Sequence, residues 1–133
     1  MSDKKLLRFI HVGKCGGSTI VKLLADSPLV SCKYQSVVQS HVCGVTLDSS
    51  CDYLICLRNP ISRAISAYEW RKKLVIADPV PNQATRFRGE LDVLNAYGSF
   101  SDLASKLYQE NASLNELVAR DFQLVHHLRE SIS

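Results

Sequence analysis

A glycine-rich segment near the start of the chain has the residue types of a phosphate-binding loop. Residues 9–19 are FIHVGKCGGST, in which a short apolar run leads into a glycine-rich turn with one lysine. Glycine lets a backbone come close to a phosphate, and the N–H groups that open a following helix point toward it. The dipole of that helix and Lys14 both add positive charge. We therefore expect this segment to bind a phosphorylated ligand.

A second segment, residues 57–68, carries further basic side chains in the sequence LRNPISRAISAY. Arg58 ends an apolar run, and Pro60 stands where a helix can begin, because its missing N–H costs nothing in a first turn. Arginine suits phosphate because its planar guanidinium donates two parallel hydrogen bonds. The segment predicts a second phosphate contact at the end of a strand.

The hydrophobic pattern predicts the elements that position these two segments. We expect an α/β domain on a parallel sheet, with ligands at the carboxyl ends of the strands and a helical C-terminal part. Ser101 and Ser113 are expected to be N-caps, the second with Glu116 in a capping box. The expected strands are 6–12, 29–32 and 53–57, the last of them central in the sheet. The expected helices begin at residue 19 and span 60–75, 91–97, 100–108 and 114–128, with a loop over 78–89.

The composition is that of an ordinary globular protein and limits the possible partners. The chain has 133 residues, of which 46% are hydrophobic and 22% charged, with a net charge of +3. We expect a single domain, with a nucleotide-binding core over 1–77 and a mostly helical remainder over 78–133. The charge suits a small anion and is too low for nucleic acid. No apolar run reaches the roughly 20 residues of a membrane span, and no signal peptide is recognised, so a cytoplasmic protein is expected.

The cysteines favour reduced thiols over disulfides or a metal site. The chain has five, none of them in a C-x-x-C pair. A zinc site from His41, Cys43 and Cys51 is conceivable but lacks the close ligand pairs of structural zinc sites, so no metal is expected. Cys56 is expected in the core.

The order of residues in the loop differs from that of an ATP- or GTP-hydrolysing protein, whose lysine directly precedes a serine or threonine. Here Lys14 comes before Gly16 and Gly17. This order resembles the phosphosulfate-binding loop of the sulfotransferases, a Pro-Lys-Thr-Gly-Gly/Ser-Thr turn after a strand. Residues 57–68 resemble the 3′-phosphate motif of the same family, Arg-Asp/Asn-Pro followed by Arg and then Ser-x-Tyr. The likeness covers about residues 6–70 and is closest to the carbohydrate branch, of the heparan sulfate 2-O-sulfotransferase type.

The resemblance implies that 3′-phosphoadenosine 5′-phosphosulfate (PAPS) is the donor and that a hydroxyl, expected on a glycan, is the acceptor. Lys14 would contact the bridging oxygen and the sulfonyl group and offset charge on the departing phosphate. Arg58 and Ser66 would hold the 3′-phosphate, with Arg63 either in support or simply solvated. The residues that would surround the 5′-phosphate are Cys15, through its backbone N–H, Gly16, Gly17, Ser18 and Thr19.

His41 is the expected general base. It stands in a Ser-His-Val sequence before the Arg58 strand, much as a His-Val pair does in the glycan 2-O-sulfotransferases. A neutral imidazole near pH 7 can take the proton of a sugar hydroxyl as the sulfonate transfers. The alternative is a histidine in a loop or packed on the sheet.

The remaining histidines and the basic run have weaker functional signals. His11 is expected to be a buried core residue, and His126 and His127 to mark a helix end. A basic group could contact an acidic glycan, or could be a solvated face. Its members are Arg71, Lys72, Lys73, Arg86 and Arg88.

Three departures from the family pattern keep alternatives open. Gly13 stands where proline is usual, Cys15 replaces threonine, and the chain is short for a sulfotransferase. Donor binding is therefore better supported than turnover, and a truncated or non-catalytic relative that only binds the nucleotide is the main alternative. An ATP- or GTP-dependent phosphotransferase is a more distant one.

Overall fold

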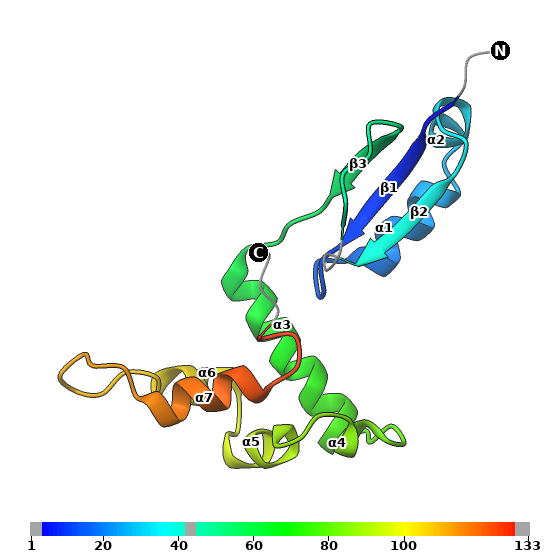
Figure 1. The fold of residues 1–133 in the computed structure, drawn as a ribbon. Coiled ribbons are helices and arrows are strands. Elements are labelled where there is room, and N and C mark those ends of the chain that lie inside the picture. Colours follow the sequence, from blue (N-terminus) through cyan, green and yellow to red (C-terminus); the bar gives the residue numbers. More distant parts are fainter. Residues whose placement is uncertain (1–3, 42–44, 130–133) are drawn as a thin grey trace. The chain divides into compact units, whose positions relative to one another are not determined.

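Strands and helices are mixed in the first part of the chain, and the elements described after residue 59 are all helical (Figure 1). The computed structural model describes residues 4–41 and 45–129. They form an α/β structure of two compact units, which divide between Arg58 and Asn59. Each unit has its own packing and is described by itself.

The first unit is built on a three-stranded parallel sheet in the order β2-β1-β3. Leu7, Phe9 and Ile10 make β1 the most buried strand. β1 thus has a strand on each side. The helix α1 packs beside β2 (Figure 1). The elements are β1 (Leu6–His11), α1 (Gly17–Ala25), α2 (Pro28–Lys33), β2 (Val37–His41) and β3 (Cys51–Ile55).

Two of the expected strands need correction. Residues 29–32 are helical, because Ser27 accepts a hydrogen bond from the N–H of Val30 at 3.5 Å and Pro28 occupies the first turn of α2. The strand expected at 53–57 is β3, which pairs with β1 alone and ends at Ile55. The central strand of the described sheet is β1.

The second unit is a cluster of helices around Tyr68, Leu94 and Leu103. Ser99 and Asn115 cap α6 and α7, so the caps expected at Ser101 and Ser113 are wrong by two residues. Part of the loop expected before Gly89 is a short helix. The elements are α3 (Pro60–Lys72), the π-helical turn η1 (Lys73–Ala77), α4 (Gln83–Arg86), α5 (Glu90–Ala96), α6 (Phe100–Ser105) and α7 (Glu116–Leu124).

A buried ion pair joins α3 to α5. Arg71 is 2% exposed and Glu90 is 1% exposed, and their shortest contact, from Nη2 to Oε2, is 2.7 Å. The Arg71 Nη1 group also donates to Oε1 of Gln83 at 2.8 Å, and Glu90 accepts from the N–H of His126 at 2.8 Å. Arg71 is therefore neither a solvated residue nor available to a glycan, contrary to both sequence interpretations of the basic run.

The burial of hydrophobic side chains on α3 is uneven. Tyr68 is buried, and its hydroxyl donates to the carbonyl of Tyr97 at 2.9 Å. Ile61 and Ile65 on the same helix are 66% and 42% exposed. Over residues 4–41 and 45–129, no helix combines the length and the apolar character needed to cross a membrane.

Candidate functional site

The glycine-rich segment forms a tight loop between β1 and α1. The N–H of Cys15 donates to the carbonyl of Val12 at 3.3 Å, which closes the turn. Lys14 and Gly16 have φ angles of 63° and 78°, in the left-handed region. That region is natural for glycine, but it costs a lysine about 1–2 kcal/mol. Such strain is concentrated at functional sites, where the surrounding structure enforces it.

The N-terminus of α1 is open to an anion. Its N-cap is Gly16, which has no side chain, and its first turn contains no acidic residue. The helix has nine residues, and its first backbone bond runs from the N–H of Ile20 to the carbonyl of Gly16 at 3.2 Å. The N–H groups of Gly17, Ser18 and Thr19 thus lie in the turn where the dipole favours negative charge. In contrast, the Asn59 carboxamide caps α3 by accepting from two backbone N–H groups.

Arg58 contacts this loop from the segment that follows β3. Its Nη1 group donates to the carbonyl of Lys14 at 3.5 Å. Partial burial lowers the pKa of Lys14, and the charge of Arg58 lowers it further. Because the two positive charges repel each other, an anion placed between Lys14 and Arg58 would be stabilised by both.

His11 and His41 lie at the same edge of the sheet. They are paired in register on β1 and β2, and their ring centroids are 5.6 Å apart. His11 Nδ1 lies 3.2 Å from Nε2 of Gln39, and its ring also packs so closely on Gly17 that a Cβ there would overlap it. His11 is only half-buried. The expectation of a buried core histidine is wrong, and its contact with the loop had no signal in the sequence.

The first unit therefore gathers three of the expected site residues at one edge. Lys14, His41 and Arg58 stand at or just beyond the carboxyl ends of β1, β2 and β3. In α/β proteins this edge binds ligands, at the point where the strand order reverses. Ser66 and Arg63 lie half-buried on α3, in the second unit. Their participation in the same site stays a prediction.

Two members of the conceivable zinc site, His41 and Cys51, lie far apart on the sheet. Cys51 pairs with Leu6 and His41 pairs with His11, at opposite ends of β1, so about 17 Å of strand separates them. Cys43 lies outside the described residues. Within the described part of the chain, no group of three or more histidine, cysteine, aspartate or glutamate side chains could hold a metal ion. Cys56, expected in the core, is half-buried just beyond β3.

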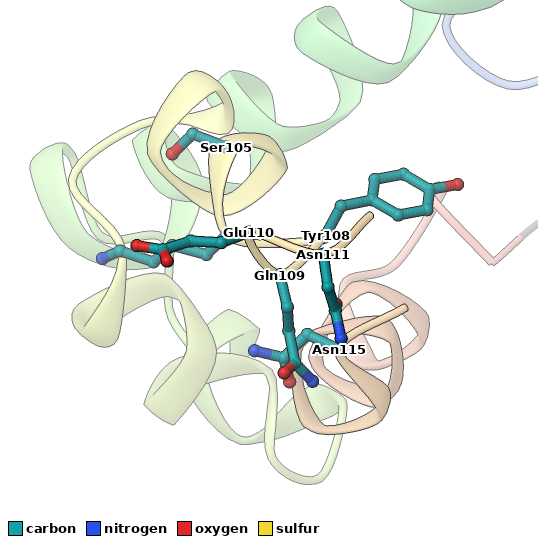
Figure 2. A pocket seen from close by; sticks show the side chains of 7 residues that line it. Ser105, Tyr108, Gln109, Glu110, Asn111 and Asn115 are labelled. Carbon is teal, nitrogen blue, oxygen red and sulfur yellow. The ribbon is translucent and has the colours of Figure 1, made fainter. Parts of the chain in front are cut away.

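A polar hollow of about 630 Å³ lies in the second unit, at the turn between α6 and α7 (Figure 2). Gln109 and Asn115 point the same way in this view, while Tyr108 points away from them. Lys106 and Glu110 supply one charge of each sign, so the hollow has no excess of positive charge. None of the expected site residues lines it. It therefore lacks the excess positive charge that a phosphate site needs.

Comparisons of the chain with protein-family models, with curated proteins and with solved structures find no match. The function is therefore inferred from the chemistry of the site. That site combines an N-terminus of α1 without a side-chain cap, a lysine in a strained conformation and an arginine from the segment after β3. Such an arrangement can bind a ligand with more than one negative group.

Proposed function

We propose that the chain is a sulfotransferase, which binds PAPS and transfers its sulfonate group to a hydroxyl, in the first instance that of a carbohydrate. The observation that carries the proposal is the contact of Arg58 with the carbonyl of Lys14. Arg58 and Lys14 each belong to one of the two motifs that resemble those of the sulfotransferases, and 44 positions separate these two residues in the sequence. PAPS has phosphate at both the 5′ and the 3′ position, and two separate cationic groups suit it.

The proposed reaction assigns a role to each residue of this edge. The acceptor oxygen attacks sulfur, the bond from sulfur to the bridging phosphate oxygen breaks, and adenosine 3′,5′-bisphosphate leaves. Lys14 offsets the charge that develops on the bridging oxygen, and the N–H groups at the start of α1 hold the 5′-phosphate. His41 takes the acceptor proton. The exposure of His41 at the end of β2 supports this role, because an acceptor could reach it.

Donor binding is tested by titrating the full chain with adenosine 3′,5′-bisphosphate in a calorimeter. We expect Arg58→Ala to weaken binding about 100-fold, since a guanidinium–phosphate contact contributes up to about 3 kcal/mol. Lys14→Gly should also weaken binding, yet raise the free energy of unfolding by about 1 kcal/mol, because glycine accepts the left-handed backbone. Affinity should fall as the pH rises through the lowered pKa of Lys14, because the neutral amine no longer attracts the anion.

Lys22→Gly is the matched control, since this exposed lysine lies in the last turn of α1, away from the loop. This variant should lose helix stability and keep its affinity for the bisphosphate. No heat from the unaltered chain at saturating bisphosphate would overturn the proposal. Magnesium-dependent ATP binding that displaces the bisphosphate would favour the phosphotransferase alternative.

Transfer is tested separately, with sulfur-labelled PAPS and a panel of glycan and phenol acceptors. We expect His41→Ala to lower the transfer rate by about 100–10,000-fold with little change in bisphosphate affinity, as for loss of a general base. Gln39→Ala, on the same strand, is the control and should retain transfer. Bisphosphate binding without transfer to any acceptor would identify the non-catalytic relative.

A further inference from the structure

The second unit concentrates positive charge around one aromatic ring. The guanidinium carbons of Arg71, Arg86 and Arg129 lie 5.1, 5.2 and 5.2 Å from the centroid of the Phe87 ring. These arginines come from α3, from the last residue of α4 and from the segment after α7. Segments distant in sequence thus bring like charges to one place, which costs free energy unless negative charge is near.

The carboxylate in this cluster is already paired with other groups. Glu90 is buried and is held by two nitrogens of Arg71 and by the N–H of His126. Neither Arg86 nor Arg129 forms an ion pair with a carboxylate in the part of the chain that the structure describes. Both side chains are exposed. Among the described residues, the cluster therefore keeps two guanidinium groups at the surface without a carboxylate partner.

Aromatic rings fix the position of these cations. His126 stacks on Phe87 with a centroid distance of 4.1 Å and an interplanar angle of 13°, and its ring lies 4.0 Å from that of His127. Attraction between a guanidinium and a ring face restrains both groups, so less side-chain freedom is lost when a ligand binds. His127 has a φ of 69°, so a strained backbone turns at this place.

We propose that Arg86 and Arg129, held at Phe87, form an oxyanion site that binds the phosphate or sulfate group of a ligand. Guanidinium forks match the oxygens of a tetrahedral oxyanion, and two of them balance a double negative charge. The site lies within the second unit and consists of residues that the donor-binding proposal does not use. It can hold or fail independently of that proposal.

The test is a titration of the full chain at pH 8, followed by the NMR signals of the arginine side-chain N–H groups. Sodium phosphate and sodium sulfate are added in separate arms, with sodium chloride keeping the ionic strength constant. We expect saturable shifts of the Arg86 and Arg129 signals in at least one arm. Either Arg86→Gln or Arg129→Gln should weaken that binding about tenfold, as for loss of one charge-assisted hydrogen bond.

Arg120→Gln is the matched control, because it removes one exposed positive charge from the same unit and should leave the affinity unchanged. Arg58→Ala should also leave these signals unchanged, which separates this site from the loop after β1. Shifts that rise linearly without saturation, or an equal loss in Arg120→Gln, would overturn the proposal. Thermal unfolding of each variant shows whether it remains folded.

Discussion

Glu90→Gln is expected to destabilise the second unit by about 3–5 kcal/mol, the cost of removing one partner from a buried ion pair. The substitution preserves size but leaves the Arg71 guanidinium without a counter-charge, although the Arg71 side chain is only 3% exposed. It also weakens the acceptor for the N–H of His126. Because a domain is typically stable by only 5–15 kcal/mol, much of the stability of this unit would be lost. The loss in free energy of unfolding is measured by urea titration, monitored through the fluorescence of Trp70.

Two variants decide whether the charge pair is responsible. Arg71→Met with Glu90→Leu removes both charges and should cost less than Glu90→Gln alone, since no ion then remains unpaired. Lys106→Met breaks the pair with Asp102, whose N–O distance is 3.0 Å but whose side chains are 53% and 37% exposed. That pair should contribute less than about 1 kcal/mol. A loss in Glu90→Gln no larger than in Lys106→Met would refute the assignment.

The elements that the sequence predicted best are those with strong local signals. The run at 6–12 is mostly apolar, and Asn59-Pro60 marks a helix start through a side-chain cap and a fixed φ. The prediction of a strand at 29–32 was wrong for the same reason. The cap at Ser27 and the proline after it outweighed a short apolar run. Local chemistry decided all of these elements. Sheet order is not local, so the edge position of β3 could not be predicted.

The site shows the same division between local and long-range information. The loop, its glycines and Arg58 could be identified from residue types, because each belongs to a short motif. The contact of His11 with Gly17 and the pairing of Arg71 with Glu90 depend on which segments meet in three dimensions. A charged residue in a basic run gives no sign that its partner lies 19 positions away on another helix. Arg71 was therefore assigned to the surface.

Gly17→Ala is expected to distort the loop and destabilise the first unit by several kcal/mol, although alanine is the better helix former by about 1 kcal/mol. A Cβ on Gly17 would lie 3.0 Å from Cγ of His11 and closer still to Cδ2 and Nε2. The ring cannot easily move away, because it also contacts Gln39 and His41. Amide hydrogen exchange of Phe9 and Ile10 in β1 measures the loss. Bisphosphate affinity should fall with it if the loop binds the 5′-phosphate.

The His11→Ala background gives the decisive comparison. With the ring removed, Gly17→Ala should become neutral or stabilising by up to about 1 kcal/mol, so the sign of its effect reverses. Gly16→Ala is the control for backbone strain, because a Cβ there comes no closer than 4.0 Å to Ile20 while φ is 78°. It should cost about 1–2 kcal/mol with or without His11. An effect of Gly17→Ala that does not depend on His11 would show that steric contact between β1 and the start of α1 does not shape this loop.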